Sequence, residues 1–374
     1  MRVIHLTSVH LWDDTRIFLK MCRAVAMAGH EVHLVAPRAD RPAGTSEAMD
    51  GVRIHAIAPV RSRRDRMFRA AGEALSTGLA LNGDLYHFHD PEFLRIAPQA
   101  QLRSGKPFIY DVHEDYREGT LEKAWIPRPL RRPLAWWSAR TEDRKAPRLA
   151  GVVCATPHIA RHFTGHPGLA VVQNFPWREE LAPLPRQAGG SRSRFAYVGG
   201  VSRLRGAHEM VAAMSRAPEG AELVIAGAWE DQSLRDACAD DPGWQRCVAA
   251  NVLDRRAVQE LLSGAAAGLV CFLPARNHCQ AQPNKLFEYM SAGIPVIASD
   301  FPLWRKIVTD TGCGLLVDPS SPEAIAEAMR RIIADPVAAQ AMGERGRQAV
   351  LGHFSWESEF PILLRLYERL VRAP

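Results

Sequence analysis

Short apolar runs alternate with amphipathic stretches along the first half of the chain. Residues 15–28 and 92–103 have the periodicity of helices. Strands that alternate with helices of about ten or more residues indicate βαβ units and a parallel sheet. The strand-like runs are residues 2–7, 32–36, 52–56, 85–88, 108–111, 152–154 and 170–172.

The second half repeats this order, and residues 321–372 have a helical pattern almost throughout. Its strand-like runs are residues 195–198, 222–226, 246–249, 268–272, 296–298 and 315–317. One hydrophobic core rarely exceeds ~250–300 residues, so a chain of 374 residues is expected to form two. We predict two doubly wound Rossmann-like α/β domains at 1–175 and 194–354. A linker at 176–193 joins them, and a C-terminal helix at 355–374 packs back on the first domain.

The composition is that of a soluble globular protein, with 47% apolar and 24% charged residues. No apolar run approaches the ~18 residues of a membrane span, and His5, His10 and Asp13 interrupt any signal peptide at the N-terminus. The seven cysteines are odd in number and form no CxxC pair, which favours a reducing compartment and no metal site. We therefore predict a cytoplasmic protein.

The net charge of +6 lies wholly in the first half, where residues 1–180 hold 26 basic and 20 acidic residues. Residues 117–148 alone carry nine basic and four acidic residues, and this segment also contains Trp125, Trp136 and Trp137. Such asymmetry favours an anionic partner: a nucleic acid, an anionic membrane surface or a phosphorylated substrate. The alternative is a set of solvated arginines around tryptophans that belong to a helix core.

Open parallel sheets bind ligands beyond the carboxyl ends of their strands. In the second half, Gly199 and Gly200 end a strand, and Arg203 and Arg205 follow. Glycines let the backbone approach a ligand closely, and arginines beside a helix start suit a phosphate. The spacing is neither GxGxxG nor a P-loop. The alternative is a turn with two exposed arginines.

A second group of candidates lies at 280–300, where Pro283 suits the first turn of a helix. The first amides of that helix, at Asn284, Lys285 and Leu286, can hold an anion. Glu288 stands among apolar neighbours, where its carboxylate can accept two hydrogen bonds from a ribose diol. The alternative is that Glu288 is an exposed helix residue.

Two clusters of histidine and acidic residues follow strands in the first half, YHFHDPE at 86–92 and YDVHEDYR at 110–117. His113 in the second cluster can bond a sugar hydroxyl or a phosphate, and His89 and Asp90 lie in the first. In the opening loop, Asp14 can cap the helix that follows it or contact an acceptor. Asp13 and Asp14 do not form a spaced DxD pair, so no metal-diphosphate site is predicted.

On these motifs the chain resembles the retaining glycosyltransferases of family 4, over nearly its whole length. The motifs are GHEVHLVAP, YHFHDPE, YDVHEDY, YVGGVSRLRG and PNKLFEYMSAGIPVIASD with GCGLLVDP after it. The resemblance implies the GT-B fold, with two Rossmann-like domains that face each other across a cleft. It implies a nucleotide sugar bound mainly by the second domain and an acceptor on the first. It also implies transfer with retention at the anomeric carbon, without metal or cofactor.

The resemblance assigns roles residue by residue. Arg205 stands where the family has its diphosphate-binding lysine, and Arg203 replaces the family arginine whose place Gly200 takes. Glu288 matches the second, ribose-binding acid of the E-x7-E motif, and the first acid position falls on the neutral Gln280.

In the first domain, His113 resembles the family histidine near the donor sugar and diphosphate. The opening loop has Asp14 and Arg16 in place of the usual glycine pair, and we assign both to the acceptor side with His89 and Asp90.

The predicted function is transfer of a hexosyl group from a nucleotide sugar, with uridine the commonest base in the family. The predicted acceptor is a lipid-linked or polysaccharide-precursor glycan at the inner face of a membrane, and no nucleic acid is expected. Two alternatives stay open. One is a sugar-nucleotide 2-epimerase of the same fold, and the other is a non-catalytic sugar-nucleotide-binding subunit, suggested by Gln280.

Overall fold

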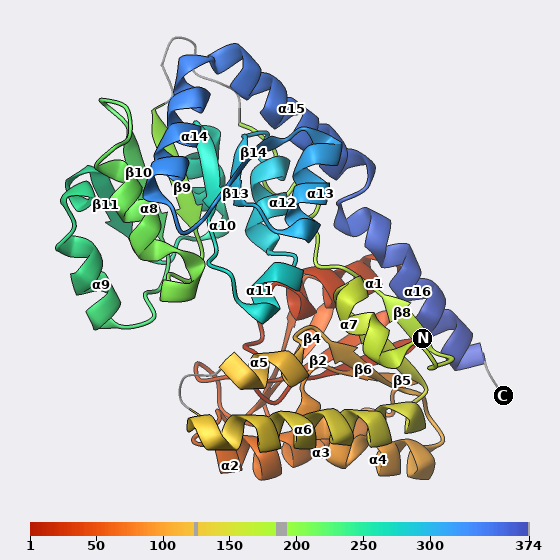
Figure 1. The fold of residues 1–374 in the computed structure, drawn as a ribbon. Coiled ribbons are helices and arrows are strands. Elements are labelled where there is room, and N and C mark those ends of the chain that lie inside the picture. Colours follow the sequence, from red (N-terminus) through yellow and green to blue (C-terminus); the bar gives the residue numbers. More distant parts are fainter. Residues whose placement is uncertain (123–125, 185–192, 373–374) are drawn as a thin grey trace. The chain divides into compact units, whose positions relative to one another are not determined.

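The computed structural model describes residues 1–122, 126–184 and 193–372, and the chain divides into two compact units (Figure 1). Unit 1 consists of Met1–Asn174 and Ser358–Pro374, and unit 2 of Phe175–Glu357. Each unit has one predominantly parallel sheet with helices on both faces. The predicted α/β fold class is confirmed. Of the predicted linker, residues 185–192 lie outside the described residues.

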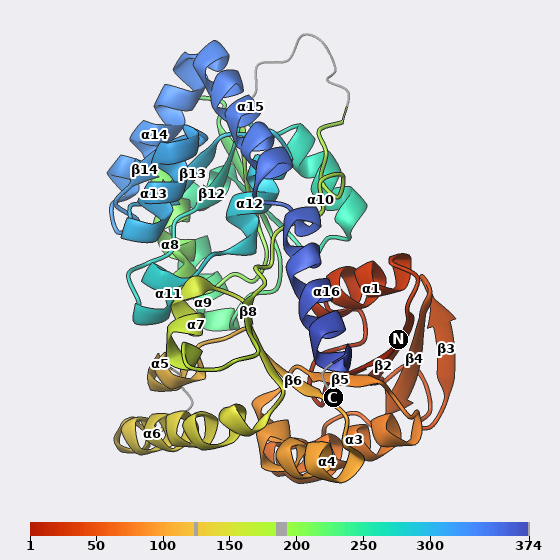
Figure 2. The same ribbon diagram turned by 90° about the vertical axis from the view of Figure 1, so that its right-hand side faces the viewer.

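The sheet of unit 1 has eight strands in the order β3-β4-β2-β1-β5-β6-β7-β8. All neighbours pair in parallel except β3, which runs antiparallel to β4 at the sheet edge (Figure 2). The seven predicted strands are present, with ends that differ by at most one residue. The strands are β1 (Arg2–Leu6), β2 (Glu31–Pro37), β3 (Ser46–Met49), β4 (Val52–Ile57), β5 (Leu85–Phe88), β6 (Phe108–Val112), β7 (Gly151–Cys154) and β8 (Leu169–Val171).

Helices cover both faces of this sheet. Helices α3 and α4 pack on the face that receives Ile4, Leu6, Tyr86 and Phe88, which form one apolar core. The α-helices of unit 1 are α1 (Arg23–Met27), α2 (Arg63–Asp65), α3 (Ala71–Ala80), α4 (Ala97–Ser104), α5 (Tyr116–Glu122), α6 (Arg128–Lys145), α7 (Pro157–Ala160) and most of α16 (Trp356–Arg372). Shorter helical turns are η1 (Ile17–Cys22), η2 (Arg66–Ala70), η3 (Pro91–Arg95), η4 (Ala146–Arg148) and η5 (Arg161–Phe163).

The sheet of unit 2 has six parallel strands in the order β11-β10-β9-β12-β13-β14. They are β9 (Arg194–Val198), β10 (Glu222–Ala226), β11 (Cys247–Ala250), β12 (Ala267–Val270), β13 (Val296–Ser299) and β14 (Gly314–Val317). The helices are α8 (Ala207–Met214), α9 (Gln232–Ala239), α10 (Arg255–Ser263), α11 (Arg276–Gln280), α12 (Asn284–Ser291), α13 (Pro302–Thr311), α14 (Pro322–Ala334) and α15 (Pro336–Gly352), with the turns η6 (Arg203–Arg205) and η7 (Pro242–Arg246).

Two apolar clusters, one on each face, hold the sheet of unit 2. The first joins α8 and α14 to the strands, and the second joins α10, α12 and α13 to the other face. The carboxyl ends of β9 and β12 and the start of α12 therefore have fixed positions around one edge. Most of the residues predicted to bind a donor lie there.

Candidate functional site

Two glycines shape the backbone that follows β9. Gly199 has φ +110 and Gly206 has φ +72, a region that side-chain-bearing residues rarely adopt. A Cβ atom on Gly206 would lie 2.0 Å from the carbonyl oxygen of Cys271, just after β12. The turn η6 therefore lies close against the end of β12, and α8 begins directly after it.

Arg205 and Lys285 form a cationic cluster at this edge. Arg205 donates from Nη1 to the carbonyl oxygen of Gly200 at 2.9 Å. Lys285, from α12, places Nζ 3.5 Å from the centre of the Tyr197 ring. Within the described residues, Lys285 Nζ is buried and has no hydrogen-bond partner. Arg203, by contrast, is exposed.

Burial lowers the pKa of Lys285 well below its ordinary value, and the positive charge of Arg205 lowers it further. A buried cation without a hydrogen-bonded acceptor is costly, because the protein must remove its hydration without replacing it. An anionic ligand beside Gly199 would supply that acceptor. The cluster thus has the chemistry of a phosphate-binding site.

Glu288 lies one turn further along α12 and is largely buried. Its Oε1 accepts a hydrogen bond from Nη1 of Arg255 at 3.0 Å, and Nη2 of Arg255 contacts Glu180 at 2.5 Å. Gln280 at the end of α11 and Asn284 at the start of α12 are half-buried. Leu286 differs from the expectation: its side chain lies in the core, and its N–H donates to Pro283 O at 3.0 Å, so that amide is already engaged.

In unit 1, Asp90 and Asp14 hold His10, which the sequence reasoning missed. Asp90 accepts hydrogen bonds from Thr7 Oγ1 at 2.9 Å and Ser8 N at 2.6 Å. His10 lies 3.3 Å from Asp14 Oδ2 through Nδ1 and 3.5 Å from Asp90 Oδ1 through Nε2. Its position four residues before Asp14 was the only local signal.

These contacts set the charges of the opening loop. Burial lowers the pKa of His10, but the hydrogen bond to Asp14 and the charge of Asp90 outweigh it and raise that pKa overall. Burial raises the pKa of Asp14, but hydrogen bonds from His10, Ile17 and Arg16 lower it to about 2. Asp14 therefore caps the following helical turn, and its Oδ1 accepts from the amides of Arg16 and Ile17.

Arg16 and His89 are buried, so the structure contradicts their assignment to acceptor contacts. Arg16 donates to Asp111 from Nε at 3.0 Å and from Nη2 at 2.7 Å. His89 Nδ1 lies 3.0 Å from Asp111 Oδ2. His113 is partly exposed, and its Nδ1 lies 3.6 Å from the same carboxylate. Asp111 thus hydrogen-bonds the buried Arg16 and His89 and also lies near the partly exposed His113.

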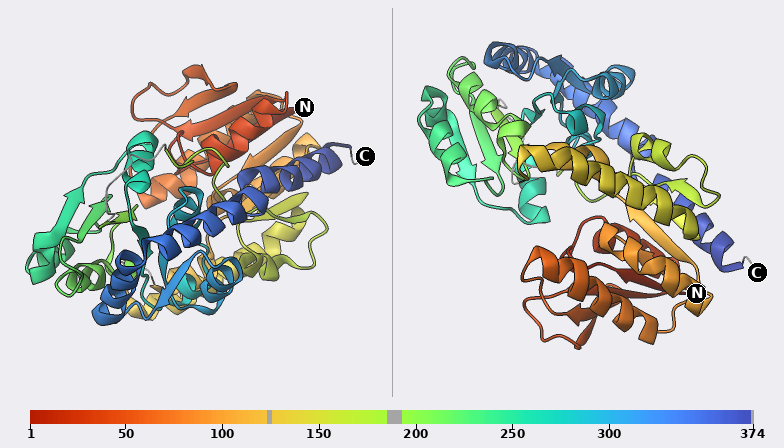
Figure 3. Two further views of the ribbon diagram at one scale, coloured as in Figure 1. Left: turned by 90° about the horizontal axis from the view of Figure 1, so that it is seen from above. Right: turned by 60° about the horizontal axis from the view of Figure 1, so that its bottom comes forward.

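Helix α6 is the long yellow helix in Figure 3. Its exposed apolar and basic side chains form a surface that we call the α6 surface. Trp136 is 64% exposed and Trp137 is 50% exposed, which rules out the alternative that they are core residues. Leu130 and Leu134 are exposed as well, among Arg128, Arg132 and Arg140. Trp125 lies outside the described residues. Within those residues, no helix has both the length and the apolar character that crossing a bilayer requires.

Family models match both halves of the chain. Residues 15–174 match the model described as Glycosyltransferase Family 4, and residues 186–349 match Glycosyl transferases group 1. The D-inositol 3-phosphate glycosyltransferase of Corynebacterium urealyticum is 29% identical over 230 residues, which cover 58% of this chain and 53% of that protein. The chain spans about half the length of the first curated relatives that it matches.

Solved structures share the fold over the full length of the chain. Sucrose-phosphate synthase from Thermosynechococcus elongatus superposes with a TM-score of 0.80 at 18% identity, and the match covers 100% of both chains. HepE of Anabaena, solved in complex with UDP-glucose, superposes with a TM-score of 0.72 at 12% identity, again over 100% of both chains. With both family models present and this fold, the chain belongs to the family 4 glycosyltransferases of the GT-B fold.

Proposed function

We propose that the protein transfers a sugar from a nucleotide-sugar donor, with retention and without a divalent metal, to a glycan acceptor. The observation that carries the proposal is the cationic cluster of Arg205 and the buried Lys285, whose Nζ lacks a hydrogen-bond partner among the described residues. The UDP-glucose bound by Anabaena HepE supports a uridine diphosphate sugar as the donor. Unit 2 then binds the donor, and unit 1 contributes His113 and the acceptor side.

In the proposed reaction the bond from the anomeric carbon to the diphosphate breaks, and a bond to the acceptor oxygen forms on the same face. Negative charge develops on the departing diphosphate, and Arg205 and Lys285 are placed to stabilise it. The acceptor proton moves to the leaving phosphate oxygen. Glu288 binds the ribose of the donor, and Gln280 offers a neutral amide to the sugar.

Incubation with UDP-glucose and candidate glycan acceptors tests this function. We expect UDP release that depends on the acceptor, and a product whose anomeric proton keeps the donor configuration by NMR. Interconversion of the donor sugar without acceptor would instead indicate an epimerase. Binding of the donor without any turnover would indicate a non-catalytic subunit.

The affinity for UDP should depend on Arg205. Replacing Arg205 by alanine removes a charge-assisted hydrogen bond to the diphosphate, worth about 1.5–3 kcal/mol, so the affinity should fall roughly tenfold to a hundredfold. Isothermal titration calorimetry with UDP measures this. The exposed Arg235, changed to alanine, is the control and should leave the affinity unchanged. Equal affinities in all three proteins would contradict the assignment of Arg205.

Transfer should continue in the presence of a chelator. The cations of Arg205 and Lys285 replace a metal at the diphosphate, and the sequence has no spaced DxD pair at Asp13 and Asp14. We expect equal initial rates with EDTA, with Mg²⁺ and with Mn²⁺. A rate abolished by EDTA and restored by Mn²⁺ would overturn the metal-independent reaction.

We further propose that the α6 surface binds the anionic inner face of a membrane and so brings unit 1 to a lipid-linked acceptor. Leu130, Leu134 and Trp137 recur at helical spacing on exposed positions. Indole rings favour the headgroup level, and each arginine near an anionic surface contributes about 1 kcal/mol. Arg140 lies 5.6 Å from the centre of the Trp136 ring, which keeps charge and aromatic surface together.

Vesicles that contain phosphatidylglycerol should sediment the protein at low salt, and salt should weaken the binding. Arg128→Glu with Arg132→Glu should abolish sedimentation. Arg131 is left intact because it donates to the carbonyl oxygen of Ile126 at 2.8 Å. A control with the same charge change, Arg235→Glu with Arg256→Glu, should sediment like the wild type. Equal sedimentation of all three proteins would exclude the α6 surface as the contact.

A further inference from the structure

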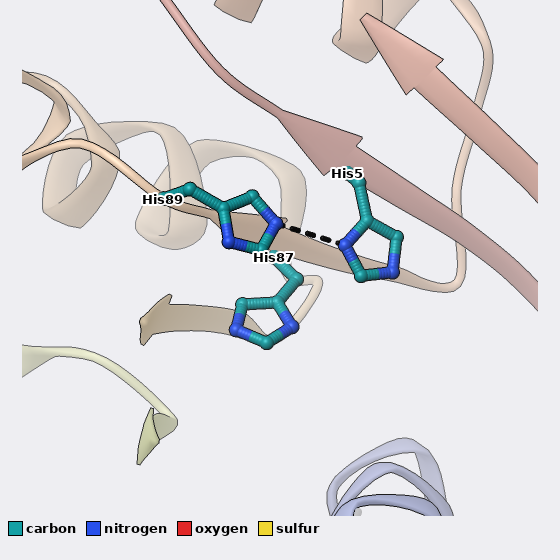
Figure 4. A group of neighbouring side chains, drawn as sticks. All are labelled: His5, His87 and His89. Atoms are coloured by element: carbon teal, nitrogen blue, oxygen red, sulfur yellow. Dashed lines mark hydrogen bonds between the residues drawn. The ribbon is translucent and has the colours of Figure 1, made fainter. Parts of the chain in front are cut away.

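Three histidines meet on the buried face of the unit-1 sheet that lies beneath α16 (Figure 4). The parallel register of β1 and β5 pairs His5 directly with His87. His89 follows two residues after His87, and residues two apart in extended chain share a face. All three side chains are 0% exposed. The neighbours Ile4 and Phe88 point into the apolar core on the opposite face.

The ring nitrogens of this cluster converge. His5 Nδ1 lies 3.0 Å from His89 Nε2, and one nitrogen of each of the three rings lies within 4.8 Å of the other two. Two imidazole nitrogens bound to a tetrahedral zinc at ~2.0–2.1 Å stand roughly 3.3 Å apart. To bind zinc, His5 Nδ1 and His89 Nε2 therefore need to move apart by only a few tenths of an ångström. The ring of His87 needs to move closer to these two nitrogens.

Hydrogen-bond partners outside the cluster orient two of the three rings, as such partners commonly orient histidines that bind a metal. His89 Nδ1 lies 3.0 Å from Asp111 Oδ2, and a carboxylate there accepts the Nδ1 proton and leaves a lone pair on Nε2. His87 Nδ1 lies 2.5 Å from the hydroxyl of Tyr367 on α16. Carboxylate and phenol partners of this kind fix the tautomer of a ligating histidine.

Hydrogen bonding within the described residues does not satisfy the cluster. Nε2 of His87, whose Nδ1 lies near Tyr367, is buried without a hydrogen-bond partner.

We propose that His5, His87 and His89 bind one divalent transition-metal ion of the zinc type, which joins β1 to β5 beneath α16. Three neutral imidazoles suit Zn²⁺, Ni²⁺ or Cu²⁺ and not Mg²⁺ or Ca²⁺. The site is structural and belongs to unit 1, whereas Arg205 and Lys285 belong to unit 2, so it does not rest on the proposed transfer. Spacing along the sequence gives no sign of it, because 82 residues separate His5 from His87.

A second histidine cluster, at Asp115, His158 and His162, is a weaker candidate. Arg161 Nη2 donates to His158 Nδ1 at 2.7 Å, so the neutral ring of His158 carries its proton on Nε2. That nitrogen is the one that faces Asp115, at 3.6 Å. This cluster is also only half-buried, with His162 exposed, and it therefore serves as a control.

The test uses zinc with the full chain, unfolded in guanidinium with chelator and refolded with and without Zn²⁺. Elemental analysis after dialysis should give about one zinc per refolded wild-type chain, and zinc should raise its unfolding temperature by several degrees. His87→Gln and His5→Gln should lose both effects. Refolding with Co²⁺ should give the visible absorption of tetrahedral cobalt in the wild type only.

Two control variants locate the ion. His55→Gln alters another histidine pair of the same sheet, in which His33 Nδ1 lies 2.8 Å from His55 Nε2 without a third ring, and it should keep the zinc. His162→Gln, in the weaker cluster, should keep it as well. Zinc-free wild-type protein after refolding with Zn²⁺ would overturn the proposal. Equal zinc in the wild type, His5→Gln and His87→Gln would overturn it too.

Discussion

Replacement of Asp111 by asparagine is expected to lower the free energy of unfolding of unit 1 by about 3–5 kcal/mol. Asp111 is fully buried, and both of its oxygens accept from the guanidinium of Arg16, which is also buried. Removing the carboxylate leaves a buried cation without its counter-charge, and His89 loses its ionic acceptor as well. An asparagine side chain of equal size changes the charge without opening a cavity.

Chemical denaturation of chelator-treated wild type and variant measures this loss. Asp40→Asn is the matched control, because Asp40 accepts from Nε and Nη2 of Arg38 with similar geometry but is 56% exposed. Exposed pairs contribute about 0–1 kcal/mol, so this variant should lose less than about 1 kcal/mol. Losses of equal size in the two variants would show that the buried ion pair of Asp111 and Arg16 stabilises the fold no more than an exposed pair does.

The same pair predicts an acid dependence. Although burial raises the pKa of Asp111, the charge of Arg16 and the hydrogen bonds from His89 and Arg16 lower it well below the ordinary value. The folded state therefore binds this proton more weakly than the unfolded state, so the stabilisation is present above the ordinary carboxyl pKa and is lost as the pH falls below it. Stability of Asp111→Asn should fall less on acidification than that of the wild type.

The sequence alone could predict the sheets and the edge at which the site residues lie. Parallel strands that are buried on both faces read as apolar runs, and their carboxyl ends carry Gly199, Arg205 and Asp90. Strand β3 was missed because its four residues, SEAM, alternate in burial without a strong apolar pattern, which is common at an edge.

Individual side-chain directions could not be predicted, because they depend on partners far along the chain. The sequence places Arg16 in a loop, but its ion-pair partner Asp111 lies 95 residues away along the chain. This ion pair buries Arg16 in the fold. Lys285 reads as the second residue of a helix and is instead directed at the ring of Tyr197. The tryptophans of α6 fitted either a core or a surface, and the packing of α6 through Ala135 and Glu142 leaves them exposed.

Lys285→Met is expected to reduce kcat/KM for transfer about 10²–10³-fold while the free energy of unfolding rises. Methionine keeps the length of the side chain and its apolar contact with Tyr197. It removes the cation that would stabilise charge on the departing diphosphate. It also removes a buried amine that has no hydrogen-bond partner among the described residues, and such a polar group disfavours the folded state. Activity and stability should therefore change in opposite directions.

Three measurements decide this prediction. Steady-state kinetics of Lys285→Met should show the loss of activity, and denaturation should show the gain of stability. The control is Lys306→Met, which should alter neither quantity, because Lys306 is exposed and pairs with Asp310 at 2.6 Å. Calorimetry of UDP binding in buffers of different ionisation enthalpy should show proton uptake by the wild type, because an anion raises a pKa that burial and Arg205 have lowered. The variant should show less uptake. If Lys285→Met instead loses stability together with activity, Lys285 supports the fold and does not act as a charge held ready for the donor.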